Sequence, residues 1–178
     1  MQRNSSTTRI IQVGMMAALV FVGTYIRITI PTPLGPTMLH LGNVCCILAG
    51  LLFGAVPGGL AAGIGSAIFD LLDPQFAAEF WITFILKFFY GFLVGAVMGR
   101  GEGRVHAIIS AVIGALSYTA LYTLKNFLML HFVLGNPMEA VLPVLGMKAL
   151  VSLSNAVVAV IVAIILYEVL GKRLRAIL

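Results

Sequence analysis

Long apolar segments separated by short polar connectors dominate this chain, and that pattern predicts helices that cross a membrane. An apolar helix of about 20 residues spans the ~30 Å hydrocarbon core of a bilayer. The pattern predicts an all-α membrane protein with one domain over residues 1–178 and six transmembrane helices. We expect these helices at about 10–29, 41–56, 59–72, 80–99, 105–131 and 142–170.

The second and third segments are the shortest, and an uncharged turn at Pro57, Gly58 and Gly59 joins them. Each approaches the minimum of about 17 residues for a crossing helix, so both are interpreted as spans. A re-entrant hairpin, which enters and leaves the membrane on one side, is the alternative for this pair.

Composition excludes an ordinary soluble protein. Hydrophobic residues make up 61% of the chain and charged residues 10%, whereas soluble domains contain about 25% charged residues. The mean hydropathy is +1.09. The net charge of +5 is spread between the apolar segments without forming a basic patch, so no nucleic-acid partner is predicted.

The basic residues outside the segments predict the orientation. They fall in three regions, and the alternate connectors at 31–40, 73–79 and 132–141 contain no Lys or Arg. Basic residues concentrate on the cytoplasmic side of membrane proteins. Six spans with both termini in the cytoplasm place all three basic regions on that side. These regions contain Arg3 and Arg9, then Arg100 and Arg104, then Lys172, Arg173 and Arg175.

Charged side chains inside the apolar segments are the candidate functional residues, because each costs at least ~2.5–3.5 kcal/mol at a bilayer centre. Lys87, Lys125 and Lys148 each lie roughly 10 Å from an outer end by helical rise. Polar residues at helical spacing share their faces. We expect an outward-facing pocket, covered by the loop at 31–40. The candidate ligand-binding residues are His40, Asn43, Asp70, Lys87, Tyr122, Lys125, Lys148 and Asn155.

These polar groups could instead satisfy one another, for example as a structural pair of Asp70 with Lys87. The three lysines share only one intramembrane acid, with Glu79 at the interface. At least one ammonium then lacks an acidic partner, which leaves room for a ligand with negative charge or strong acceptors. Alternatively, one lysine is neutral or extends toward the surface.

Motifs for catalysis or nucleotide binding do not occur in the chain. There is no P-loop, no HExxH, no nucleophile elbow and no metal-ligand spacing. We therefore predict no catalytic residue, cofactor or metal site, and no ATPase activity of its own. Gly14 and Ala18 stand four apart on the first segment, a small-residue spacing that favours contact with a partner helix.

Three stretches of sequence resemble a known family. They are His40-Leu41-Gly42-Asn43, AGLLFGAVPGGLAAGIGSAIFDLL at 49–72 and WITFILKFFYGFLVG at 81–95. Together they resemble the substrate-binding S-components of energy-coupling-factor (ECF) vitamin transporters, in the riboflavin-type branch. The resemblance covers essentially the whole chain in length and span count, and is sharpest over 38–95.

The resemblance implies a six-helix subunit of the bacterial cytoplasmic membrane that binds a vitamin-like molecule near the outer face. It also implies a transmembrane T subunit and two cytoplasmic ABC-type ATPases as partners. The family's small-residue motif for the T subunit corresponds to Gly14 and Ala18, with Gly where Ala is usual. The pocket of the family corresponds to His40, Asn43, Lys87, Lys125, Lys148 and Asn155.

Two other functional classes stay open on the sequence. A stand-alone secondary transporter is normally larger and built from internal repeats, and no half-to-half repeat is evident here. A membrane scaffold protein would not need three buried lysines on its outer side. The identity of the substrate does not follow from the resemblance.

Overall fold

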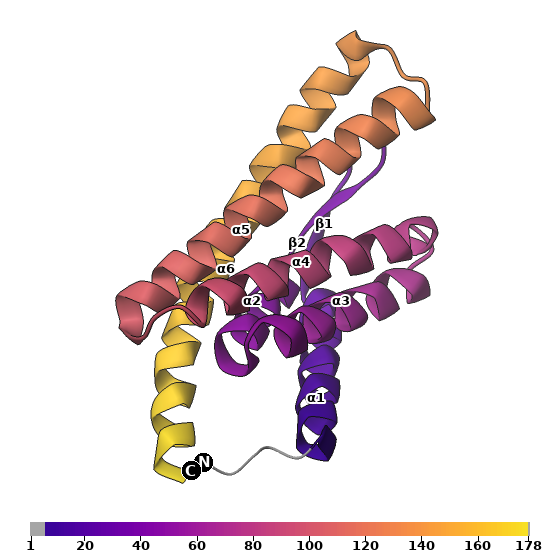
Figure 1. Cartoon of the computed structure of the whole chain (residues 1–178). Coiled ribbons are helices and arrows are strands. Elements are labelled where there is room, and N and C mark those ends of the chain that lie inside the picture. The colour runs from indigo at the N-terminus through magenta and orange to yellow at the C-terminus, as the bar shows by residue number, and fades with distance from the viewer. Residues whose placement is uncertain (1–5, 178) are drawn as a thin grey trace.

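The computed structural model describes residues 6–177, with side chains through residue 170, and is mostly helical (Figure 1). Arg3 lies outside the described residues, as do the side chains of Lys172, Arg173 and Arg175. The elements in chain order are α1 (Ser6–Tyr25), β1 (Arg27–Ile30), β2 (Thr37–His40), α2 (Gly42–Phe53), α3 (Ala55–Leu72), η1 (Ala77–Glu79), α4 (Phe80–Met98), α5 (Gly103–Phe127), η2 (Leu128–Val133) and α6 (Met138–Ile177).

Five helical stretches of the described chain are long and apolar enough to cross a membrane: α1, α3, η1 with α4, α5 with η2, and α6. The remaining helix, α2, has 12 residues. It reaches about 18 Å by helical rise, less than the ~30 Å hydrocarbon core. A full span over 41–56 is therefore not confirmed, and six crossing helices stay a prediction.

The first helix ends earlier than predicted because a β-hairpin follows it. Helix α1 ends at Tyr25, and β1 pairs antiparallel with β2 in a register that sets Arg27 opposite His40. The β-branched residues of β1 favour a strand, and Gly35 has a φ of +93° in the turn between the strands. The predicted helix was wrong over 27–29, and the predicted all-α fold omitted the hairpin.

The break between α2 and α3 lies at Gly54, not at the predicted turn of Pro57 to Gly59. Gly54 has a φ of +83°, in a backbone region that residues with a Cβ rarely adopt. Pro57 instead lies in the first turn of α3, where a helix does not need its missing N–H.

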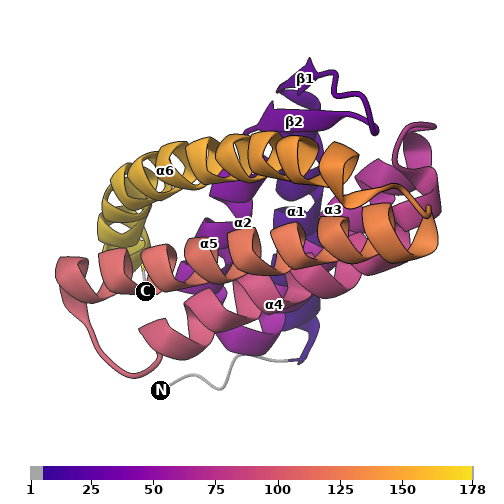
Figure 2. The same ribbon diagram turned by 90° about the horizontal axis from the view of Figure 1, so that it is seen from above.

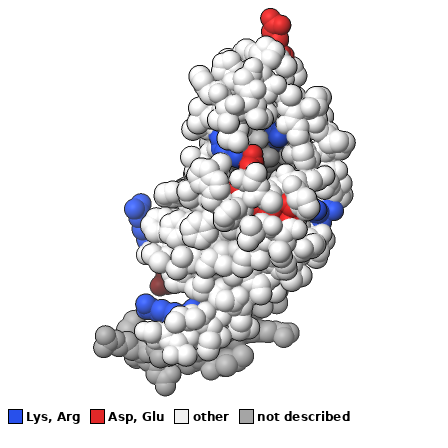
Figure 3. Space-filling model, turned by 90° about the vertical axis from the view of Figure 1, so that its right-hand side faces the viewer, with Lys and Arg blue, Asp and Glu red and all other residues white. Residues whose placement is uncertain are grey.

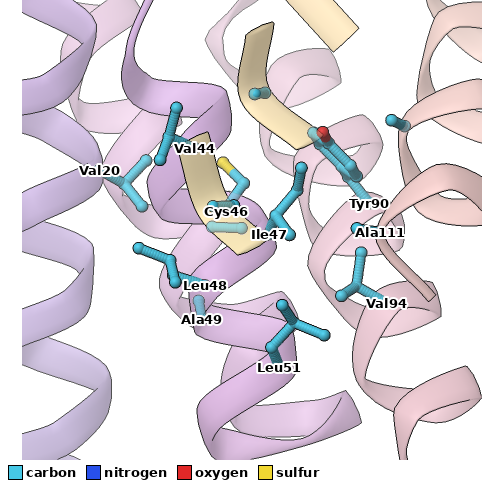
Figure 4. Packing of buried hydrophobic residues seen from close by; sticks show 14 of the residues in the cluster. Val20, Val44, Cys46, Ile47, Leu48, Ala49, Leu51, Tyr90, Val94 and Ala111 are labelled. Atoms are coloured by element: carbon cyan, nitrogen blue, oxygen red, sulfur yellow. The ribbon is translucent and has the colours of Figure 1, made fainter. Parts of the chain in front are cut away.

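Helix α2 lies at the centre of the bundle and contacts α1, α3, α4, α5 and α6 (Figure 2). Its apolar side chains pack against Val20 of α1, Tyr90 and Val94 of α4, and Ala111 of α5 (Figure 4). This packing holds α2 in place and fixes the position of its first turn, which carries Asn43.

Helices α3 and α4 approach so closely that their backbones touch. A Cβ added at Gly91 would lie 2.8 Å from the carbonyl carbon of Gly58, and one at Gly59 would lie 2.8 Å from the carbonyl oxygen of Phe88. Small residues permit this distance. The contact aligns α3 and α4, which carry Asp70 and Lys87.

The connections lie at two ends of the molecule. The start of α1 and the end of α6 lie at one end, and the hairpin and the connection from α5 to α6 lie at the opposite end (Figure 1). The cytoplasmic location of both termini stays a prediction.

Candidate ligand-binding cavity

A polar cavity lies between the hairpin and the helix bundle. Figure 3 shows one face of the molecule. A hollow lies in its upper part, with Lys or Arg and Asp or Glu atoms around the hollow. The centres of water-sized molecules can occupy about 80 Å³ of the cavity, whereas one water needs about 10–15 Å³. All eight residues predicted to bind a ligand line this cavity: His40, Asn43, Asp70, Lys87, Tyr122, Lys125, Lys148 and Asn155.

Lys87 of α4 is 3% exposed. Its ammonium donates a hydrogen bond to Asn43 Oδ1 of α2 and lies 4.0 Å from the centre of the Tyr118 ring on α5. The ring face attracts a desolvated cation by about 2 kcal/mol. Among the described side chains, no ion pair joins Lys87 to Asp70. The structural pair considered from the sequence is therefore absent, and an amide and a ring hold Lys87 instead.

Three tyrosines form a stack beside Lys87. The centroids of the Tyr90 and Tyr118 rings are 5.0 Å apart at an interplanar angle of 13°. Tyr118 and Tyr122 are 6.0 Å apart at 28°. The hydroxyl of Tyr122 lies 3.3 Å from Thr37 Oγ1, which connects this stack to the hairpin. Tyr118 and Tyr122 line the cavity, so one wall of it is aromatic.

Lys125 and Glu79 form an ion pair across the cavity. Lys125 comes from α5 and Glu79 from η1, so the pair joins α5 to the connector before α4. Their side chains are 12% and 32% exposed, respectively. Glu79 thus neutralises Lys125, one of the three cavity lysines. The sequence alone did not identify the partner of this lysine.

Lys148 of α6 is 6% exposed. Its ammonium donates to the carbonyl oxygen of Pro36 and to Asn126 Oδ1, both at 3.4 Å. Both acceptors are neutral, and both distances exceed the usual ~2.7–3.2 Å. No acid lies within ion-pair distance of Lys148 among the described residues.

Polar contacts hold the hairpin over the cavity. Asn155 of α6 accepts a hydrogen bond from the backbone N–H of His40 at 3.1 Å and donates to the carbonyl of Met38 at 3.0 Å. From the other strand, Arg27 forms an ion pair with Asp73 at 2.5 Å. The hairpin is therefore attached to α6 on one side and to the end of α3 on the other.

Two buried polar atoms at the cavity have no hydrogen-bond partner among the described residues: His40 Nδ1 and Ser66 Oγ. Burial, together with the charges of Lys87 and Arg27, holds the pKa of the His40 imidazole well below its usual range. His40 is therefore neutral at physiological pH. A neutral imidazole and a hydroxyl can each offer one hydrogen bond to a ligand.

Gly14 and Ala18, predicted to contact a partner helix, lie on α1 away from the cavity. Both are exposed, and no atom in the described part of the chain comes within 4 Å of a Cβ built at Gly14. Exposed Met15 and Leu19 lie next to them. This surface is separate from the cavity, and its role as a partner site stays a prediction.

The hairpin and the connector before α4 supply further cavity residues that the sequence pattern did not identify. Thr37 and Met38 lie on β2, and Phe76 precedes η1. Arg27 was placed inside the first span, but it lies on β1 and does not line the cavity.

The family described as "ECF-type riboflavin transporter, S component" matches residues 4–172 of the chain. A solved structure described as "Structure and mechanism of the S component of a bacterial ECF transporter" matches with a TM-score of 0.65 at 22% sequence identity. The match covers 97% of this chain and 98% of that one. At that identity it shows a shared fold. No curated protein sequence matches the chain.

Proposed function

The chain belongs to the family of ECF-type riboflavin transporter S components, and we propose that the cavity beneath its hairpin captures a small water-soluble vitamin for uptake. As a member of that family, it is a multi-pass membrane protein and the substrate-binding subunit of an ECF transporter. The observation that carries the proposal is the cavity itself. Eleven buried polar or charged residues occur in the described chain, and most of them line this one space.

The chemistry of the cavity supports a ligand that is both polar and flat. Lys87 and Lys148 present ammonium groups, and His40 and Ser66 present unpartnered polar atoms. Tyr118 offers a ring face on which a planar group can stack. Buried polar groups without partners cost free energy, so a ligand that supplies the missing hydrogen bonds binds favourably.

The working assembly is also part of the proposal. We propose one domain with six membrane-embedded helices, cytoplasmic termini and a location in the bacterial cytoplasmic membrane. A transmembrane T subunit would contact Gly14 and Ala18, and two cytoplasmic ABC-type ATPases would supply energy. The exposed position of both residues on α1 supports this assignment.

The test is to purify the protein from cells in detergent, extract the bound small molecules and identify them by mass spectrometry. Calorimetric titration of the emptied protein with the identified compound should give one binding site per chain. Riboflavin is the first compound to titrate. If no small molecule is extracted and no water-soluble vitamin binds, the proposal is wrong.

A further inference from the structure

Two short segments between the helices lie in the wall of the cavity. The hairpin and its turn supply four lining residues, and the connector at 73–79 supplies Phe76 and Glu79. The remaining lining residues belong to helices, which pack against one another in the bundle. The hairpin and the connector are therefore the parts of the wall that can move while the bundle stays intact.

The connector carries two acids, and each pairs with a basic residue of a different element. Glu79 pairs with Lys125 of α5, and Asp73 pairs with Arg27 of β1 at 2.5 Å. Among the described residues, no other ion pair or hydrogen bond joins the hairpin to the connector. The Arg27 guanidinium also lies 6.0 Å from the centre of the Phe76 ring. Arg27 is thus the residue through which the hairpin holds the connector.

Each partner of this ion pair is fixed within its own segment. Asp73 Oδ1 accepts a hydrogen bond from the Gln75 N–H at 2.9 Å, and the Asp73 carbonyl accepts one from the Phe76 N–H at 3.0 Å. On the hairpin, the Arg27 guanidinium donates to Met38 Sδ of β2 at 3.7 Å. Neither Arg27 nor Asp73 lines the cavity, so neither is placed to contact a molecule inside it.

Resting on the proposed function, we propose that a captured molecule enters and leaves between the hairpin and the connector, and that the pair of Arg27 and Asp73 holds this route closed. The two side chains are 22% and 11% exposed, so water and salt screen their attraction less than that of a fully exposed pair. The other edge of the hairpin is held to α6 by the neutral hydrogen bonds of Asn155. The route opens when the hairpin and the connector separate at the ion pair, and its two members are positioning residues.

The location of the pair determines which rate constants depend on it. Because Arg27 and Asp73 lie outside the cavity, their attraction is the same whether or not a molecule is inside. Weakening it raises the fraction of open protein by one factor for entry and for release. The association and dissociation rate constants, kon and koff, should therefore rise together, and Kd, their ratio, should stay constant. Loss of a residue that touched the ligand would instead weaken Kd mainly through koff.

The experiment measures kon and koff of the full-length protein in detergent by stopped-flow fluorescence, with riboflavin as the probe. The co-purified molecule replaces riboflavin if riboflavin does not bind. Asp73→Asn removes one charge and keeps an oxygen that can accept the hydrogen bond from the Gln75 N–H, and Arg27→Gln removes the other charge. We expect each variant to raise both rate constants about three- to tenfold, the effect of one partly exposed ion pair, while Kd stays within about twofold.

Two comparisons assign the effect to the pair itself. The double variant Arg27→Gln with Asp73→Asn should be no faster than either single variant, because the second substitution has no partner left to lose. Arg104→Gln is the control, since it removes an ion pair with Glu168 that joins α5 to α6 outside the cavity lining. It should change neither rate constant, and thermal unfolding shows whether each variant is folded.

The outcomes separate this inference from the proposed function. Unchanged rate constants in folded Asp73→Asn protein would overturn the inference and leave the proposed function intact. A rise of koff alone with a weaker Kd, or additive effects in the double variant, would overturn it as well. If Arg27→Gln does not fold, Asp73→Asn decides alone. If the wild type binds neither riboflavin nor a co-purified molecule, the proposed function is wrong and the inference is wrong with it.

Discussion

Replacing Lys87 with methionine tests whether the residue contacts the ligand or only supports the fold. Lys87→Met replaces the side chain by an unbranched apolar one that is one atom shorter, and it removes the charge. If the ammonium donates to the ligand, the loss of that charged hydrogen bond should cost about 1.5–3 kcal/mol, or roughly ten- to a hundredfold in Kd. Calorimetric titration with the co-purified molecule measures this change.

The structure indicates that Lys87→Met changes the thermal stability less than it changes the Kd. The variant loses the contact with the Tyr118 ring, worth about 2 kcal/mol, and leaves Asn43 Oδ1 without its donor. It also removes the desolvation cost of a buried ammonium, on the order of several kcal/mol. Because these effects oppose each other, we expect thermal stability close to that of the wild type.

The control is Ile85→Met, which introduces the same residue at an exposed position on the same helix. It should change neither affinity nor stability. A folded Lys87→Met protein that binds with the affinity of the wild type would refute the ligand contact. If Lys87→Met is unstable and adding Asp70→Asn restores stability, Lys87 serves to balance the charge of Asp70.

Three further predictions concern other parts of the molecule. Gly14→Leu or Ala18→Leu should block vitamin uptake in cells while the purified variant keeps its Kd, and unchanged uptake would exclude this surface as the docking site. Gly91→Val should strongly lower the unfolding temperature, because its Cβ would meet the Gly58 backbone; normal stability would contradict the close packing of α3 and α4. The pKa of His40 is depressed from its usual 6.5, so protonation of this side chain favours the unfolded chain. The free energy of unfolding should therefore fall as the pH drops below 6.5, by up to about 1.4 kcal/mol per pH unit. His40→Gln should remove this part of the acid dependence.

Helix positions followed from the sequence where apolar runs were long and breaks were charged. The fourth helix was expected at 80–99 and forms at Phe80–Met98. Hydropathy was a poor guide where the chain changed conformation, because Ile26, Ile28 and Ile30 extend the apolar pattern of α1 into the strand β1. Hydropathy also gives no sign of the break at Gly54, which lies within a continuous apolar run. Gly54 separates α2 from α3 through its backbone conformation, not through its polarity.

The candidate cavity was more predictable than its internal contacts. Helical rise and shared faces were enough to expect Lys87, Lys125 and Lys148 at similar depth, and the structure brings them to one cavity. Their partners depend on side-chain geometry across helices. The pairing of Lys125 with Glu79, and of Lys87 with an amide of α2, depends on the relative positions of α2, η1, α4 and α5, which no periodicity encodes.

The most direct test of the account is native mass spectrometry of the protein released from detergent, which detects a bound vitamin on the intact chain. We predict one vitamin-sized molecule per wild-type chain. The molecule should be absent from a folded Ser152→Phe variant, because Ser152 lines the cavity and the larger ring would fill it. A wild-type chain that carries no molecule when vitamin is supplied, or equal occupancy in Ser152→Phe, would contradict capture in this cavity.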